Sequence, residues 1–104
     1  METAFWDYKE KVAFNKEKAD KVVLAETSHS RTTLWCLLPG QHIHPHEHEG
    51  DHIWIVLEGE GTFLGDGGPR PVGPGTVLVA PQGQAHGIDN SGKQGLVFVS
   101  VSAG

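Results

Sequence analysis

Disulfide partners, long hydrophobic runs and basic charge are all scarce in this chain of 104 residues. Cys36 is its single cysteine, so no disulfide can form within the chain, which fits a reducing compartment such as the cytoplasm. The sequence has no apolar run of about eighteen residues and no signal-peptide core near its start, so we expect neither membrane insertion nor export. Thirteen Asp and Glu against eight Lys and Arg give a net charge of -5, which disfavours nucleic acid as a partner.

Glycine and proline are absent from the first 38 residues, whereas all fourteen Gly and all six Pro occur from Pro39 onward. Residues 1–20 carry Phe5, Trp6 and Tyr8 among charged residues, and we interpret them as an N-terminal arm with loose helical spacing. Residues 21–104 form a single domain of ordinary size. Short apolar runs separated by Gly- and Pro-rich turns predict an all-β sandwich or barrel without a helix of ordinary length after residue 38. The predicted strands cover residues 21–26, 31–38, 53–58, 61–64, 75–80 and 96–102.

Five of the seven histidines lie within eleven residues, all at even positions: His42, His44, His46, His48 and His52. Alternate residues of a strand share a face, so His46 and His48 are well spaced to bind one metal ion. His52 has the parity of a third ligand, provided that Gly50 introduces no bulge. Pro45 interrupts a simple strand through residues 42–46, and a solvated histidine-rich loop remains the alternative.

The spacing around these histidines follows a known pattern. Gly40 is followed by five residues, His46-Glu47-His48, three residues, His52, six residues and Gly59. This arrangement resembles the first motif of the cupins, in which the position of His52 usually holds Glu.

Fifteen residues separate Gly59 from a second pattern. Gly75 is followed by five residues, Pro81-Gln82-Gly83, two residues, His86, three residues and Asn90. This arrangement is similar to the second cupin motif, so two independent patterns occur in the family's order.

The resemblance implies a cupin double-stranded β-helix, or jelly-roll barrel, of six to eight strands with a short N-terminal arm. It also implies a metal site formed by His46, His48, His52 and His86, since some cupins use four histidines. The cofactor would be one divalent transition metal: Mn, Fe, Ni, Co, Cu or Zn. Four neutral imidazoles would leave the site with a charge near +2, which strengthens a Lewis acid and favours anionic ligands.

Several other residues are candidates for the substrate pocket. Trp54 shares the parity of His52, and we expect Trp54, Phe63 and Phe98 to pack in the core, to contact substrate, or both. His42 and His44 are expected at exposed or rim positions, with substrate binding or proton transfer as the alternative.

Two residues with reactive or polar side chains are given structural roles. Cys36 lies in an apolar strand and is interpreted as a small buried hydrophobe, with a nucleophile paired with His86 as the alternative. Asn90 is interpreted as a turn former rather than a catalyst.

The resemblance implies a metal-dependent enzyme of oxygenase, isomerase or cyclase type that acts on a small oxygen-bearing organic molecule. Secondary-metabolite, polyketide or antibiotic biosynthesis is one setting suggested by analogy. The alternative from another class is a non-catalytic cupin that binds or senses a metal or small ligand. The expected partners are that small molecule and a second copy of the chain, since cupins often dimerise through N-terminal strands; the arm could equally cover its own barrel.

Overall fold

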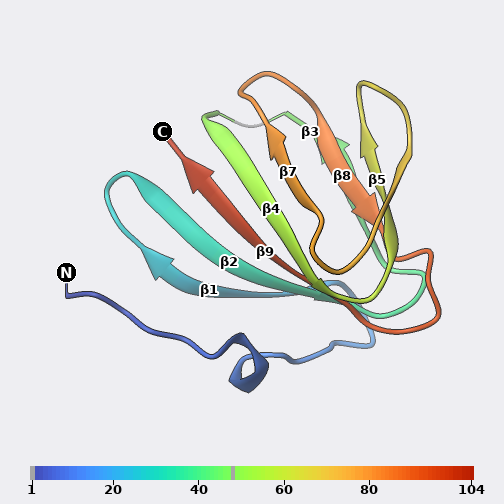
Figure 1. Ribbon diagram of the computed structural model, residues 1–104, viewed down its shortest axis with the longest axis horizontal. Helices are drawn as coiled ribbons and strands as arrows, with labels where there is room; N and C mark the ends of the chain where they lie inside the picture. Colours follow the sequence, from blue (N-terminus) through green and yellow to red (C-terminus); the bar gives the residue numbers. More distant parts are fainter. Residues whose placement is uncertain (1, 48) are drawn as a thin grey trace.

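The computed structural model describes residues 2–47 and 49–104, and for His46 the backbone alone (Figure 1). Among these residues a single turn of 3-10 helix, Tyr8–Glu10, precedes nine strands. The strands are β1 (Asp20–Glu26), β2 (Ser30–Leu37), β3 (His42–His46), β4 (Asp51–Glu58), β5 (Gly61–Gly65), β6 (Arg70–Val72), β7 (Val77–Ala80), β8 (His86–Asp89) and β9 (Leu96–Ala103). No helix in the described ranges is long and apolar enough to cross a membrane.

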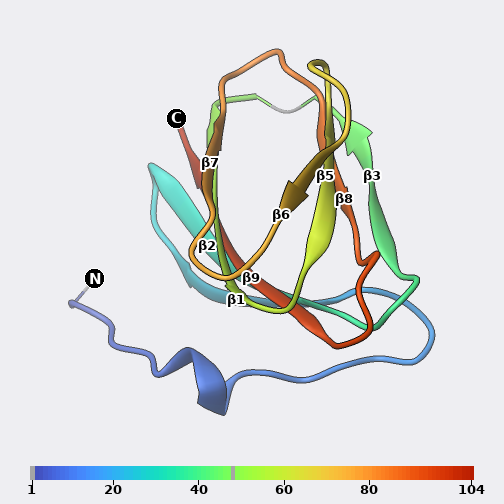
Figure 2. The same ribbon diagram turned by 45° about the vertical axis from the view of Figure 1, so that its right-hand side comes forward.

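The strands form two antiparallel sheets that face each other (Figure 2). Sheet A has the order β1-β2-β9-β4-β7, and sheet B has the order β3-β8-β5-β6. The predicted all-β barrel is therefore confirmed, with nine described strands instead of the six to eight that were expected. The three strands missing from the prediction, β3, β6 and β8, are short and contain Pro45, Pro71 and Gly87. Proline and glycine weaken the sequence signal of a strand.

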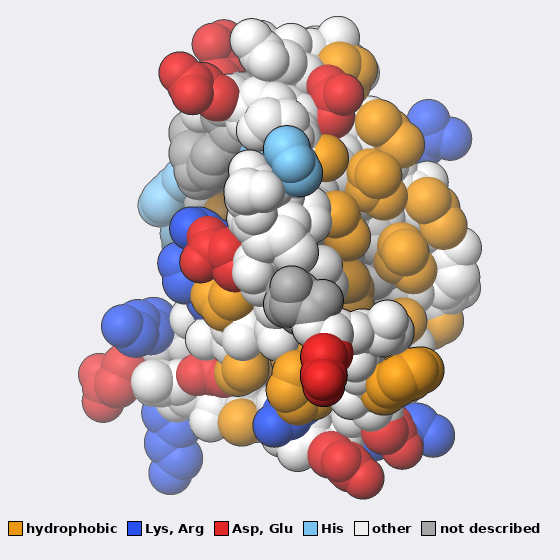
Figure 3. Space-filling model, turned by 90° about the vertical axis from the view of Figure 1, so that its left-hand side faces the viewer, with side chains coloured by type: hydrophobic (Ala, Val, Ile, Leu, Met, Phe, Trp, Pro, Cys, Tyr) orange, Lys and Arg blue, Asp and Glu red, His pale blue; other side chains and the backbone are white. Residues whose placement is uncertain are grey.

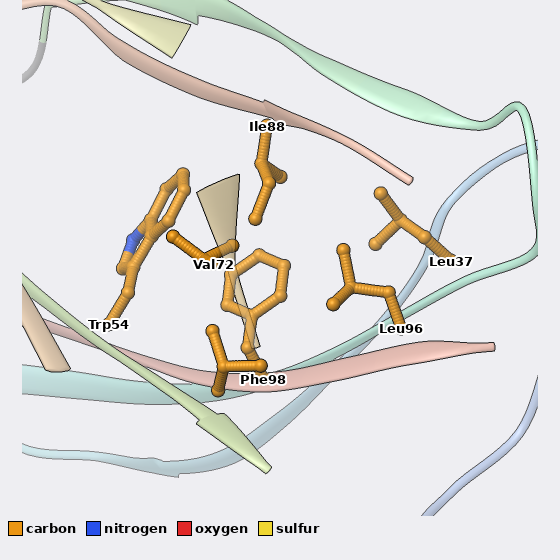
Figure 4. Packing of buried hydrophobic residues seen from close by; sticks show 7 residues of the cluster. Leu37, Trp54, Val72, Ile88, Leu96 and Phe98 are labelled. Carbon is orange, nitrogen blue, oxygen red and sulfur yellow. The ribbon is translucent and has the colours of Figure 1, made fainter. Parts of the chain in front are cut away.

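Strand alternation places the core between the two sheets. Along β4 the side chains of His52, Trp54 and Val56 are buried and point inward, as their shared parity predicts. Phe98 on β9 and Ile88 on β8 are fully buried between them. Figure 4 shows this cluster, with Trp54 at one end of the packed side chains. The core thus fills one part of the barrel and leaves the His52 end of β4 for a site.

The outer face of sheet A is partly covered by the arm. Tyr8 and Val12 pack against the buried side chains of Leu34, Cys36 and Val97. The Tyr8 hydroxyl donates a hydrogen bond of 2.8 Å to Glu58 Oε2. The arm therefore lies on its own barrel. Where the sequence predicted loose helical spacing, the described part of the arm forms a single turn of 3-10 helix.

Cys36 belongs to this outer cluster and not to the barrel interior. Burial raises the pKa of the Cys36 thiol above its usual value, which keeps the sulfur protonated. The prediction of a small buried hydrophobe is confirmed. The alternative, a nucleophile paired with His86, is wrong because Cys36 faces away from the interior.

The arm leaves another part of the outer face exposed. Val77 and Val79 on the edge strand β7 each retain 61% of their accessible surface, and Ile53 and Ile55 of β4 lie beside them in the register. Figure 3 shows hydrophobic side chains gathered on one side of the molecule, to the right in that view. Patches of this kind often mark interaction surfaces.

Candidate metal centre

Two of the four predicted metal ligands lie together inside the barrel. His52 on β4 and His86 on β8 come from different sheets, and their side chains are 8% and 2% exposed. Their ring centroids are 4.7 Å apart, with the ring planes tilted by 44°. Two adjacent buried imidazoles are a donor set that suits a divalent transition metal.

The orientation of His86 is set by a backbone contact. Its Nδ1 lies 3.0 Å from the carbonyl oxygen of Gln84. A carbonyl oxygen can only accept, so Nδ1 must carry the hydrogen and the lone pair of the neutral ring belongs to Nε2. Metal-binding histidines commonly donate their other ring N–H to a carbonyl or carboxylate in this way.

His46 reaches the same region by a register shift in β3. His42 and Ile43 pair with Asp89 and Ile88, but the next pair is His46 with His86, so β3 has one extra residue. The extra residue forms a bulge, which changes the face on which later residues of the strand lie. The backbone of His46 is therefore directly opposite that of His86.

Gly87 makes room for this bulge. A Cβ atom at Gly87 would collide with the carbonyl oxygen of Ile43, and it would lie 2.5 Å from Pro45 N. Only glycine allows β3 to approach β8 this closely, so the residue beside His86 helps to determine the register of His46.

His42 and His44 lie on the exposed outer face of β3, as expected for solvent-exposed positions. Their ring centroids are 4.4 Å apart, and the two Nε2 atoms are separated by 3.1 Å. Even numbering alone therefore does not place His42 and His44 with the buried His52 and His86.

His48 lies outside the described residues, as does the side chain of His46. Among the side chains that are described, no three His, Cys, Asp or Glu form a group able to hold a metal ion. The structure thus brings together His52 and His86, and the complete four-histidine set stays a prediction.

Gln82 links the loops that lead to the two buried histidines. Its Oε1 accepts a hydrogen bond of 3.2 Å from Gly50 N, and its backbone N donates one of 3.1 Å to Asp51 Oδ1. The loop before His52 is therefore fastened to the loop before His86.

A pocket of about 650 Å³ lies beside these histidines, between the inner faces of the two sheets. His52, Trp54 and His86 line it together with the hydroxyls of Thr33, Ser100 and Ser102. These hydroxyl residues were not predicted as site candidates from the sequence. Strand alternation could have identified two of them, because Ser100 and Ser102 have the same parity as Phe98 and so point into the barrel, where most side chains are apolar.

Charged side chains surround the mouth of the pocket. Arg31 is paired with Glu26 through contacts of 2.9 Å and 2.7 Å to one carboxylate oxygen. Lys21 has no such ion pair among the described residues, and its Nζ lies 5.7 Å from the centre of the Trp35 ring. Lys21 therefore supplies positive charge to the pocket wall, and Glu49 supplies negative charge.

The three aromatic pocket candidates occupy different depths. Trp54 lines the pocket, whereas Phe98 is fully buried behind it at a centroid distance of 4.8 Å. Phe63 meets the Trp54 ring edge to face at 6.0 Å and packs against the core. Phe63 and Phe98 thus shape the pocket by supporting Trp54.

Comparison with known proteins agrees with this architecture. The chain is 35% identical over 80 residues to an oxalate-binding protein from Thermotoga maritima, covering 73% of this chain and 66% of that protein. It is 35% identical over 60 residues to a dimethylsulfoniopropionate lyase from Ruegeria pomeroyi, covering 58% of this chain and 39% of the lyase. The matched regions span less than two thirds of both relatives.

The fold has a similar counterpart among solved structures. A conserved protein with a double-stranded beta-helix domain from Klebsiella pneumoniae superposes with a TM-score of 0.90 at 33% identity, over 98% of this chain and 90% of that one. The cupin domain family matches residues 33–102, which include His52, Trp54 and His86. The chain belongs to the cupin family.

Proposed function

We propose that this protein holds a divalent transition metal and binds a small carboxylate, such as oxalate, on it. His46, His48, His52 and His86 would be the ligands. The observation that carries the proposal is the buried pair of His52 and His86, with Nδ1 of His86 held by a backbone carbonyl. Imidazole ligands of this kind suit Mn, Fe, Co, Ni, Cu and Zn.

The charges around the pocket favour an anionic ligand. Neutral imidazoles would leave the charge of a divalent ion uncompensated, and this charge attracts an anion. Among the lining side chains, Arg31 pairs with Glu26, and Lys21 and Glu49 have opposite charges. Thr33, Ser100 and Ser102 supply hydroxyls that can donate to carboxylate oxygens. The similarity to an oxalate-binding protein supports oxalate as the first ligand to test.

The chain's own residues would bind and orient the ligand. Lys21 attracts the anion, and the hydroxyls of Ser100 and Ser102 orient its oxygens on the wall formed by β9. The apolar cluster behind Trp54 keeps water away from one side of the pocket. When bound, the metal would supply a Lewis acid that polarises a ligand oxygen.

Catalytic turnover of such a molecule is the second candidate function. It is favoured by the similarity to a lyase. Oxygenase, isomerase and cyclase reactions are the classes to screen. Measurement of oxygen uptake and product formation with oxalate, diketones, enediols and catechols separates turnover from binding alone.

Elemental analysis of untagged protein, purified without immobilised metal, tests the metal site. We expect close to one equivalent of a transition metal per chain, and His86→Ala should lower metal affinity at least ~10-fold because a ligand is removed. His42→Ala is the matched control: this exposed imidazole lies on the outer face of β3, so the variant should lose metal acquired on the exterior and keep the one equivalent bound in the barrel. Protein that never approaches one equivalent, even after incubation with Zn²⁺, Mn²⁺ or Ni²⁺, would contradict the proposal.

Calorimetry with oxalate then tests the ligand. Metal-loaded protein should bind oxalate, and metal-free protein should bind it much more weakly. Equal oxalate affinity with and without metal would show that the ligand does not bind on the ion.

A further inference from the structure

The indole ring of Trp54 is enclosed by aromatic neighbours. It is 4% exposed, and it contacts the rings of Phe98 at 4.8 Å, Phe63 at 6.0 Å and His86 at 5.3 Å between centroids. The planes of Trp54 and His86 cross at 78°. These contacts hold the ring in one orientation beside the candidate metal centre.

The polar atom of this ring is buried without an acceptor. Trp54 Nε1 has no hydrogen-bond partner among the described residues. Figure 4 shows the nitrogen on the edge of the ring that faces away from Val72 and Phe98. A buried indole N–H normally has a hydrogen-bond partner, and leaving it unsatisfied destabilises the folded state. Trp54 lines the pocket, so a ligand oxygen held there lies beside the indole ring, and a small shift of the ring would bring the buried Nε1 to it.

We propose that Trp54 Nε1 donates a hydrogen bond to an oxygen of the bound carboxylate and so acts as a positioning and specificity residue. The proposal rests on the proposed function, and it adds a neutral donor to the charged groups described above. An indole nitrogen donates only, does not titrate in the ordinary pH range and does not bind metal. It therefore favours a ligand with a lone pair near His86 over one that presents an N–H or a methyl group.

Nuclear magnetic resonance of the indole groups tests this directly. The chain has three tryptophans, so protein labelled with ¹⁵N at the indole nitrogens gives three signals, and Trp54→Phe identifies the one from Trp54. In zinc-loaded protein, oxalate should move the Trp54 indole proton downfield and leave the Trp6 signal unchanged. Trp6 is a suitable internal reference because it lies in the arm and is 49% exposed.

Calorimetry provides the second measurement. Trp54→Phe keeps an aromatic ring but removes the N–H, so oxalate affinity should fall ~10-fold, the loss expected for one hydrogen bond to a charged group. Zinc content should not change, and Trp6→Phe is the matched control with unchanged affinity. Zinc content near one equivalent also confirms that the Trp54 variant is folded.

The outcomes separate the two proposals. If oxalate binds but the Trp54 indole signal does not move, or if Trp54→Phe binds oxalate within twofold of the wild type, the inference is overturned and the proposed function stands. If zinc-loaded wild-type protein does not bind oxalate, the proposed ligand is wrong and the role of Trp54 is overturned with it.

Discussion

Asn90 illustrates how one buried polar side chain can organise three segments. Its Nδ2 donates to the carbonyl oxygens of Leu37 and Gln94, both at 2.8 Å, and its Oδ1 accepts from Gly92 N at 3.0 Å. The side chain is 2% exposed, so water cannot replace these bonds. The predicted structural role is confirmed, but its reach across the fold to the end of β2 exceeds that of a local turn former.

Asn90→Ala should lower the free energy of unfolding by about 3 kcal/mol, because the buried carbonyl group of Leu37 and the partly buried one of Gln94 lose their donor. Urea denaturation at neutral pH measures this change. Ser91→Ala is the control, since Ser91 is exposed and makes a single hydroxyl contact with Thr62, and its loss should cost under about 1 kcal/mol. Equal free energies of unfolding for Asn90→Ala and Ser91→Ala would contradict this structural role of Asn90.

At the level of single residues, the sequence predicted inward positions well where strands are regular. His52, Trp54 and Val56 are buried as their parity requires, and so is Phe98. Parity could not show that the Trp54 nitrogen is buried without an acceptor, or that Nδ1 of His86 contacts Gln84. These features depend on rotamers and on chain segments that are distant in sequence.

The strand pair β3 and β8 determines how the histidine-rich segment enters the site. The bulge after Ile43 brings the backbone of His46 opposite His86, and Gly87 provides the space. The sequence did not predict this pairing, because a count of alternate residues contains no information on register. Pro45 and Gly87 were the available signals, since both residues favour irregular strands.

Gly87→Ala should displace β3, because its methyl group would collide with the backbone of Ile43 and Pro45. We expect a loss of about 1–3 kcal/mol in stability, as for other overpacked sites, together with weaker metal binding at the His46 and His86 positions. Thermal unfolding and zinc titration measure the two effects.

The control for this variant is Gly67→Ala, where a Cβ would meet no atom within 4 Å and the backbone φ is not positive. It should leave stability and zinc affinity nearly unchanged. Gly87→Ala protein that binds zinc with wild-type affinity would show that the bulge does not position the site.

At the scale of the whole molecule, sheet A has two apolar faces. Its inner face packs in the core, whereas its outer face is only partly covered by the arm. Because the arm packs on its own barrel around Tyr8 and Val12, it leaves Val77 and Val79 exposed. We propose that this uncovered part pairs with the same surface of a second copy, because Val77 and Val79 form an exposed apolar patch with Ile53 and Ile55, which is suited to a self-complementary contact. The homodimer expected from the sequence would then form through β7 rather than through the arm.

Light scattering of the eluting protein tests this arrangement. The wild-type chain of 11.2 kDa should elute with about twice that mass, and Val77→Lys with Val79→Lys should give a monomer because lysines cannot be buried unpaired at the interface. Val23→Lys is the matched control on the pocket side of β1 and should remain a dimer. A monomeric wild-type protein would rule the dimer out.

The exposed His42 and His44 pair has a practical consequence. Two imidazoles whose Nε2 atoms lie 3.1 Å apart on an open strand surface form the type of chelate that nickel resin retains. Untagged protein would then adhere to such a column and carry ions acquired on its exterior, which inflates any metal count. Ion exchange is therefore the appropriate first chromatographic step, and a His42→Ala background separates metal acquired during preparation from metal bound in the barrel.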